Sequence, residues 1–229
     1  MERMVKRAGL FGGTFNPIHM GHLRVAEEVK TGFGLDRVYF IPAALPPHKD
    51  TAGLVNADDR HAMIALAIAS NPGFAVSDVE IRRAGRSYTI DTVKSFQADA
   101  SGDAAFYLLI GMDAFFEMTT WKSYEMLFEK IAFIVMTRPS ASALGPKGGF
   151  DAIAEYARLH VDRNYRVNPE EKCLVHGSKQ PIWIHEVTQL EISSTTTRSL
   201  VGRGESIKYL VPDAVEEYIL TKDLYTYGT

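Results

Sequence analysis

Short apolar runs alternate along this chain with stretches of helical periodicity, and this alternation restricts the fold more than any other feature. Six runs are rich in β-branched and aromatic residues and are bounded by Gly, Pro or charge: residues 5–11, 38–41, 74–79, 105–110, 131–137 and 182–187. Strands separated by helices form βαβ units, in which parallel strands are covered by helices on both faces. We therefore expect an α/β fold with a doubly wound, mostly parallel sheet.

Six segments have the apolar spacing of helices: residues 20–31, 56–68, 89–100, 113–130, 151–160 and 212–220. Asn56 is expected to cap the second, because an Asn followed by acids in the first turn is typical of a helix start. Residues 140–180 are poorly patterned, and their first part reads as a loop. We expect a single domain over residues 1–229, with the sheet in residues 1–190 and a small C-terminal helical part in residues 191–229.

Charge and composition limit the kinds of partner that the protein is expected to bind. The formal net charge is −3, from 25 basic and 28 acidic residues, so we expect neither a nucleic-acid-binding nor a membrane-binding surface. The charged N-terminus is followed by an apolar stretch, residues 8–11, that is too short for export, and no run is long enough to span a bilayer. Cys173 is the single cysteine and forms no internal disulfide. These features favour a cytoplasmic protein and leave open whether it forms a homo-oligomer.

A glycine-rich turn with two histidines follows the first expected strand. It reads Gly12-Gly13-Thr14-Phe15-Asn16-Pro17-Ile18-His19-Met20-Gly21-His22. Glycines let an anion approach the backbone, and the helix just beyond offers N–H donors and the positive end of its dipole. His19 and His22 share one helix face, so both rings can donate to phosphate oxygens, while Gly21 leaves room for a ligand. The motif predicts a phosphate site at the carboxyl end of the strand, where ligands bind in such sheets.

Five further blocks accompany this motif. They are Pro46-Pro47-His48-Lys49, Gly85-Arg86-Ser87-Tyr88-Thr89-Ile90-Asp91-Thr92, Ile110-Gly111-Met112-Asp113 with Trp121 eight residues on, Thr137-Arg138-Pro139, and Ile192-Ser193-Ser194-Thr195-Thr196-Thr197-Arg198. Together with the H-x-G-H signature at residues 19–22, they resemble the nucleotidyltransferase superfamily and, within it, the bacterial nicotinate-nucleotide adenylyltransferases, over almost the whole chain. The resemblance implies a Rossmann-like nucleotidyltransferase fold. Two features depart from the family: Thr197 stands where Ile or Val is usual, and residues 140–180 match poorly.

The resemblance implies adenylyl transfer from ATP to nicotinate mononucleotide, giving nicotinate adenine dinucleotide and pyrophosphate in NAD biosynthesis. The attacking phosphate is already an anion, so the protein needs no general base; it has to align two phosphates and stabilise their charge. The catalytic residues implied are His19, His22, Lys49 and Arg198. The ATP-binding residues implied are Gly12, Gly13, Thr14, Phe15, His19, Gly21, His22, Gly111, Asp113, Ile192, Ser193, Ser194 and Arg198.

Several of these residues also have plain structural explanations. Asp113 suits a helix cap as well as a ribose contact, and Ser193-Ser194 suits a serine cap as well as a phosphate contact. Lys49 follows two prolines that stiffen the loop, which favours a phosphate clamp over a solvated lysine. The sequence leaves both interpretations of each residue open.

The residues expected to bind nicotinate mononucleotide are Asn16, Lys49, Tyr88, Thr89 and Trp121. A flat pyridine ring suits stacking on Trp121. The N–H groups of Tyr88 and Thr89 at a helix start favour a carboxylate over a carboxamide, whose own NH₂ would leave a donor unpaired. The alternatives are a core tryptophan and, for Asn16, a turn residue before Pro17.

Magnesium is expected to arrive with the ATP phosphates, because the sequence contains no carboxylate cluster for a protein-held metal; no organic cofactor is expected. Three alternatives stay open. Two are enzymes of the same superfamily, a nicotinamide-mononucleotide and a pantetheine-phosphate adenylyltransferase. The third is a non-catalytic nucleotide-binding module on the same fold, which the presence of His19, His22, Lys49 and Arg198 disfavours.

Overall fold

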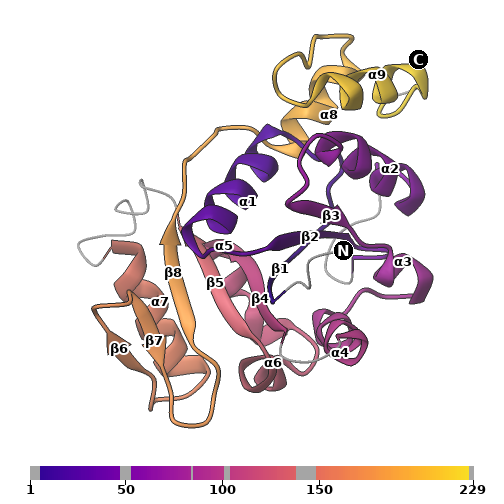
Figure 1. Ribbon diagram of the computed structural model, residues 1–229. Helices are drawn as coiled ribbons and strands as arrows, with labels where there is room; N and C mark the ends of the chain where they lie inside the picture. The colour runs from indigo at the N-terminus through magenta and orange to yellow at the C-terminus, as the bar shows by residue number, and fades with distance from the viewer. Residues whose placement is uncertain (1–5, 47–52, 84, 101–103, 138–147, 227–229) are drawn as a thin grey trace.

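The computed structural model describes residues 6–46, 53–83, 85–100, 104–137 and 148–226, which form an α/β fold around an eight-stranded sheet (Figure 1). The strands are β1 (Arg7–Gly13), β2 (Arg37–Pro42), β3 (Phe74–Val76), β4 (Ala105–Gly111), β5 (Ala132–Thr137), β6 (Arg166–Asn168), β7 (Cys173–Val175) and β8 (Ile182–Glu186). Their order in the sheet is β3-β2-β1-β4-β5-β8-β7-β6. The six predicted strands are all present and pair in parallel, which confirms the expected sheet.

The sequence pattern does not predict β6 and β7, which form an antiparallel hairpin at one edge of the sheet. Both lie in the poorly patterned residues 140–180. Each strand has three residues. Unlike β3, which has the same length but lies in the longer apolar run of residues 74–79, neither is part of a longer run that would mark it as a strand. Their pairing with β8 makes the sheet mixed rather than fully parallel.

The order of the strands reverses beside β1. This strand pairs with β2 on one side and with β4 on the other. At such a switch point the connections leaving the two strands diverge to opposite faces and leave a crevice beyond the carboxyl ends. These ends are Gly13 of β1 and Gly111 of β4. The fold therefore brings the glycine-rich motif to the position where a ligand is expected.

Helices cover both faces of the sheet (Figure 1). They are α1 (Met20–Gly32), α2 (Ala57–Ile68), α3 (Val79–Arg83), α4 (Thr89–Asp99), α5 (Met112–Phe116), α6 (Tyr124–Lys130), α7 (Gly148–His160), α8 (Ser194–Gly202) and α9 (Asp213–Thr221), with a 3-10 turn η1 (Met118–Thr120). Buried residues of α1, α2, α8 and α9 join one hydrophobic cluster, and those of α4, α5, α6 and α7 join a second. In β4, Leu109 belongs to the first cluster and Leu108 and Ile110 to the second, as alternating strand geometry requires.

The predicted helix over residues 113–130 is wrong, because the structure divides it into α5, η1 and α6. The backbone is extended at Trp121 (φ −83°, ψ 145°), and Ser123 has a φ of 52°, in the left-handed region. Residues in these conformations cannot continue the hydrogen bonds from residue i to residue i−4. The break takes Trp121 out of a regular helix.

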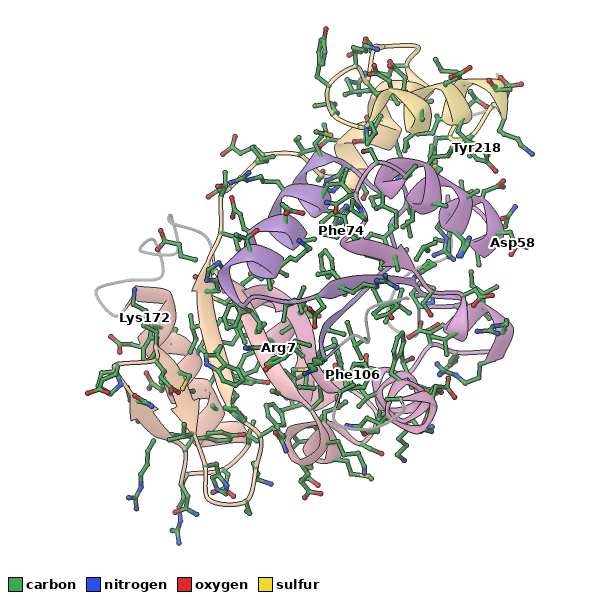
Figure 2. All side chains as sticks on the ribbon, in the orientation of Figure 1. Arg7, Asp58, Phe74, Phe106, Lys172 and Tyr218 are labelled. Carbon is green, nitrogen blue, oxygen red and sulfur yellow. The ribbon has the colours of Figure 1, made fainter. Side chains whose placement is uncertain are left out.

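The C-terminal helices pack on the face that carries α1 and α2. Asn56 caps α2 as predicted, since its Oδ1 accepts a hydrogen bond from Asp59 N–H (2.7 Å). Tyr218 of α9, labelled in Figure 2, donates its hydroxyl to Asp59 Oδ1 (2.7 Å). Pro212 is the residue just before α9 rather than part of its first turn. Within the described ranges, no helix has the length and apolar character needed to cross a membrane.

Candidate active site

A cavity of about 300 Å³ opens at the carboxyl ends of β1 and β4. Its wall is built from segments that are far apart in the sequence: the motif after β1, the end of β4, the start of α4 and the break before α6. The predicted site residues on this wall are Gly12, Gly13, Thr14, Tyr88, Thr89, Gly111 and Trp121. The cavity thus joins residues predicted for ATP to residues predicted for the mononucleotide.

Gly12 and Gly111 border the cavity from neighbouring strands. Among the described residues other than the chain neighbours, no atom lies within 4 Å of the position that a Cβ would take at either glycine, so a ligand can come close to the backbone there. A Cβ on Gly13, in contrast, would stand 2.9 Å from the ring of Phe15. Gly12 therefore keeps space for a ligand, whereas Gly13 makes room for a side chain of the protein.

Phe15 combines a buried ring with an unusual backbone. Its side chain belongs to the core and lies edge-on to His22, with ring centroids 5.0 Å apart. Its φ is 48°, in the left-handed region that bulky residues rarely adopt and that is often associated with functional sites. The Phe15 N–H has no hydrogen-bond acceptor among the described residues. The backbone of Phe15, not its side chain, can therefore serve the predicted contact with ATP.

The two histidines of the motif are in direct contact. Their rings stack with centroids 3.6 Å apart, and the His19 N–H donates to His22 Nδ1 (3.3 Å). A Cβ on Gly21 would stand 3.0 Å from His19 Nδ1. This corrects the expectation that Gly21 leaves room for a ligand, because the His19 ring occupies that space and needs a glycine beneath it.

Burial determines the charge of His19. It lowers the pKa of this imidazole to about 4, because a buried ring loses the hydration that favours its charged form. His19 is therefore neutral near pH 7. His22 Nδ1 accepts a hydrogen bond from a backbone N–H, so the proton of a neutral His22 ring is on Nε2. In this tautomer His22 carries the N–H donor at Nε2 that the predicted phosphate contact requires.

The start of α1 offers fewer backbone donors than predicted. Met20 N–H donates to Leu210 O (2.9 Å), and His22 N–H donates to His19 O (3.0 Å). Gly21 N–H has no acceptor in the part of the chain that the structure describes. The first turn therefore keeps one of these three N–H groups, together with the positive end of the helix dipole, for an anion.

The C-terminal serines lie at the start of α8 beside the motif. Ser193 Oγ accepts a hydrogen bond from Thr196 N–H (3.0 Å), which is the capping contact that the sequence left open. Ser194 donates its hydroxyl to Pro17 O (2.8 Å). Both hydroxyls have partners inside the protein. The predicted phosphate contacts of Ser193 and Ser194 consequently depend on backbone N–H groups of this helix start.

Two more residues of the same block have clear positions. Thr197 is fully buried and donates its hydroxyl to Ser193 O (2.9 Å). This bond satisfies the hydroxyl where the family usually has an apolar side chain. The carbonyl oxygen of Ile192 lies 3.9 Å from the Cβ position of Gly21. The block therefore lies beside the motif at Gly21.

Arg198 and Asn16 are joined, because Arg198 Nη1 donates to Asn16 O (2.7 Å). The side chain of Asn16 is buried and fully engaged. Its Nδ2 donates to Gly53 O (2.9 Å), and its Oδ1 accepts from Val55 N–H (3.2 Å) and from the Tyr225 hydroxyl (2.9 Å). Asn16 thus connects the motif to two other segments, while its contact with the mononucleotide stays a prediction.

The other end of the cavity has the donors and the ring predicted for a pyridine carboxylate. Tyr88 is the extended residue before α4, and the N–H groups of Tyr88 and Thr89 donate to no acceptor among the described residues. Trp121 is half-buried in the cavity wall. Lys122 Nζ lies 4.5 Å from the centroid of the Tyr88 ring and 3.0 Å from Asp91 Oδ2. The sequence analysis did not single out Lys122.

Asp113 is not part of the cavity wall, and Lys49 cannot be placed relative to it. Asp113 is exposed in the first turn of α5, and the capping residue of that helix is Gly111. The capping alternative for Asp113 is therefore wrong, and its ribose contact stays a prediction. Lys49 lies outside the described residues, as do residues 47, 48, 138 and 139. Pro46, the last described residue before Lys49, lies in the cavity wall.

Sequence reasoning missed two residues that hold the loops of the site. Ser87 accepts a hydrogen bond from Ala44 N–H at its Oγ (2.8 Å) and donates its own N–H to Leu45 O (3.0 Å). The sequence feature that could have identified Ser87 is its position directly before Tyr88 in the block of residues 85–92. Arg60 of α2 is fully buried and bonded to backbone carbonyls of three segments. No local signal distinguishes it from a solvated arginine on a helix.

Comparison with known proteins agrees with this geometry. The profile of the Cytidylyltransferase-like family matches residues 10–200. A protein of Syntrophotalea carbinolica named "Probable nicotinate-nucleotide adenylyltransferase" is 43% identical over 219 residues, which are 96% of this chain and 97% of the relative. A protein of the same name from Geobacter sulfurreducens is 42% identical over 221 residues, 96% of this chain and 99% of the relative.

Solved structures support the fold. Plasmodium falciparum nicotinic acid mononucleotide adenylyltransferase complexed with NaAD matches with a TM-score of 0.70 and 18% identity, over 96% of this chain and 97% of that chain. The same protein complexed with APC matches with a TM-score of 0.66 and 17% identity, over 96% and 97%. At such identities the likeness concerns the fold alone, and it confirms the expected Rossmann-like nucleotidyltransferase fold.

Proposed function

This chain belongs to the cytidylyltransferase-like family, and we propose that it transfers the adenylyl group of ATP to nicotinate mononucleotide in NAD biosynthesis. The products are nicotinate adenine dinucleotide and pyrophosphate. Relatives named nicotinate-nucleotide adenylyltransferase, which match 96% of the chain, support the proposal. The observation that carries it is that one cavity borders both the glycines of the phosphate motif and the N–H donors of Tyr88 and Thr89.

The proposed reaction needs alignment more than acid–base chemistry. An oxygen of the mononucleotide phosphate attacks the α-phosphorus of ATP, a new P–O bond forms, and the bond to the bridging oxygen breaks, so that pyrophosphate leaves. Because the attacking group is already an anion, no side chain has to remove a proton. A pKa of about 4 makes His19 a poor proton acceptor near pH 7, which agrees with a role as a neutral donor and not as a base.

We assign the triphosphate to the side of the cavity formed by Gly12, Gly13 and Thr14, next to the rest of the motif and the start of α8, which bonds to the motif at Asn16 and Pro17. The donors that we assign to it are His19, His22, the backbone N–H groups of Phe15 and Gly21, those at the start of α8, and the guanidinium of Arg198. Hydrogen bonds from such fixed donors stabilise the charge that develops on the α-phosphoryl and leaving groups. Lys49, which lies outside the described residues, is expected to add a point charge on phosphate.

We assign the pyridine ring to the side formed by α4 and the break before α6. Trp121 offers a face for stacking, and the N–H groups of Tyr88 and Thr89 suit a carboxylate. Lys122, in the same wall and paired with Asp91, adds a positive charge that attracts a carboxylate more strongly than a neutral carboxamide. These contacts favour nicotinate over nicotinamide mononucleotide, and they offer nothing specific to a pantetheine phosphate.

Magnesium fits this site as an ion carried by ATP. Among the described residues, no group of three or more His, Cys, Asp or Glu side chains could hold a metal ion, while the motif supplies donors for phosphate oxygens. When bound with ATP, the ion would screen the phosphate charges and favour departure of pyrophosphate. We expect the enzyme to act in the cytoplasm, on the basis of its sequence composition.

A comparison of three acceptors tests the proposal. Pyrophosphate release from ATP and magnesium is measured with nicotinate mononucleotide, nicotinamide mononucleotide and 4′-phosphopantetheine. We expect release with all components present and the highest kcat/KM for nicotinate mononucleotide. A higher kcat/KM for either other acceptor would contradict the assigned substrate. Absence of release with all three would favour a non-catalytic nucleotide-binding module.

A further inference from the structure

Arg60 is a fully buried arginine that is bonded almost entirely to main chain. It extends from α2 behind the motif, and its exposed fraction is 0%. Nη1 donates to Thr14 O (2.8 Å), Nη2 to Ala43 O (2.6 Å) and Ala44 O (3.2 Å), and Nε to Val55 O (2.9 Å). One guanidinium therefore holds the loop after β1, the loop after β2 and the segment before α2 in a single arrangement.

The bond to Thr14 O determines where the next N–H group points. The peptide bond between Thr14 and Phe15 is trans, since Asn16-Pro17 is the one cis bond in the described chain. In a trans peptide the C=O and the following N–H point in opposite directions. With Thr14 O drawn inward by Arg60, the Phe15 N–H is directed away from Arg60, and it has no acceptor among the described residues. The chain leaves this peptide with a left-handed φ of 48° at Phe15, a conformation that the surrounding structure has to hold in place.

The buried positive charge of Arg60 also favours an anion in front of the loop after β1. No carboxylate of the described residues forms an ion pair or a hydrogen bond with its guanidinium, whose partners are carbonyl oxygens. A buried cation is costly unless polar groups surround it. Burial lowers the pKa of Arg60, yet a guanidinium stays protonated in proteins. The positive charge thus lies behind the loop where we assign a polyanion, at a low local dielectric that strengthens its effect.

We propose that Arg60 is a positioning residue for the triphosphate: by holding the Thr14 carbonyl inward, it presents the Phe15 N–H to a phosphate oxygen. Arg60 touches no substrate and acts through the loop. The inference rests on the proposed function only in taking the polyphosphate to be that of ATP. It adds to the site a residue from α2 that the phosphate motif does not contain.

Amide NMR tests the orientation directly. Inorganic tripolyphosphate is titrated into ¹⁵N-labelled protein, and the Phe15 amide resonance is followed. In the unchanged protein we expect a saturable downfield shift of this resonance, as for an N–H that donates to an anion. Absence of a Phe15 response at saturating tripolyphosphate would overturn the proposal, whatever the behaviour of any variant.

Arg60→Lys tests the role of the guanidinium. A lysine keeps the charge but its single ammonium cannot reach carbonyls in three segments. We expect tripolyphosphate affinity to fall, and KM for ATP to rise, by about tenfold to a hundredfold, which corresponds to loss of one hydrogen bond to a charged group. The Phe15 shift should be lost. KM for nicotinate mononucleotide should change by less than about threefold, because the substitution disturbs a contact with ATP and leaves the binding of the other substrate unchanged.

Met63→Ala is the matched control. Met63 is also fully buried on α2, one turn after Arg60, and packs in the core cluster. Its loss should lower stability through a core cavity but leave tripolyphosphate affinity and the Phe15 response unchanged. If Met63→Ala weakened tripolyphosphate binding as much as Arg60→Lys, the role of Arg60 would be merely structural and the proposal wrong. A protein that gave the Phe15 response but no adenylyl transfer would support this inference and contradict the proposed function alone.

Discussion

The imidazole rings of His19 and His22 stack with centroids 3.6 Å apart and an angle of 27° between their planes. The His19 ring also covers Gly21, whose Cβ position is 3.0 Å from His19 Nδ1. The two histidines therefore act as one packed unit at the start of α1. Their relative position depends on a glycine between them.

Gly21→Ala should separate activity from stability. The added methyl group has to displace the His19 ring, so we expect turnover to fall by about tenfold or more through misplacement of the histidine pair. The higher helix propensity of alanine stabilises the fold by about 1 kcal/mol, whereas moving the buried ring costs a similar amount, so the free energy of unfolding should change by no more than about 1 kcal/mol. Steady-state kinetics and urea unfolding measure the two effects. The control is Gly177→Ala, because no described residue beyond the chain neighbours lies within 4 Å of that Cβ position, and it should change neither quantity. Normal turnover in Gly21→Ala would show that the ring does not need this space.

His22→Ala should keep the fold and lose roughly 10²–10³ in turnover, the usual effect of removing one fixed donor that stabilises transition-state charge. The reason is the loss of the Nε2–H donor. The measurement is kcat for pyrophosphate release, with circular dichroism to verify the fold. His61→Ala on α2, away from the cavity wall, is the control and should keep its turnover. Near-normal turnover in His22→Ala would contradict the assigned role.

Stability should fall in acid because of His19. Between pH 6.5 and about pH 4 the unfolded chain binds a proton at His19 that the folded protein does not, since burial lowers the folded pKa to about 4. The stabilisation that the neutral ring provides is complete above pH 6.5 and is lost as the pH falls. The free energy of unfolding should decrease by about 3 kcal/mol in all, of which about 2 kcal/mol is lost between pH 7 and pH 5. Urea unfolding at the two pH values measures it. In His19→Gln this part of the pH dependence should disappear, and an unchanged pH dependence would be evidence against a buried neutral ring.

Trp121→Leu should weaken binding of the mononucleotide and not of ATP. Leucine keeps an apolar side chain but removes the flat ring, and stacking of a base on an aromatic ring contributes about 1–3 kcal/mol. We expect KM for nicotinate mononucleotide to rise by about five- to a hundredfold, with KM for ATP unchanged. Trp183→Leu is the control, because Trp183 packs against Phe33 and Tyr107, away from the cavity. An equal rise in both KM values for Trp121→Leu would show that Trp121 serves the packing of the protein and does not stack on the mononucleotide.

Local patterns were sufficient wherever an element is long and regular. The strands β1, β2, β4, β5 and β8 are five to seven residues long, and the apolar runs within them predicted the parallel sheet. The prediction failed where a single residue changes the backbone, as Ser123 does with its φ of 52°. It also failed for β6 and β7, since three-residue strands are held by pairing with each other and with β8 rather than by their own pattern.

The candidate site also combines features that local sequence predicts with features that only the fold shows. The sequence by itself determined the motif, its histidines and the helix starts, because helix caps, glycine turns and i, i+3 spacing are properties of neighbouring residues. Only the tertiary structure decided which polar groups remain for a ligand. Asn16 has partners 37, 39 and 209 residues away, and Arg60 bonds to Thr14, 46 residues before it. Hydrogen bonds between such distant residues leave no mark on local spacing. The folded chain alone therefore shows that Asn16 is engaged, that the His19 ring covers Gly21, and that the Phe15 N–H has no acceptor among the described residues.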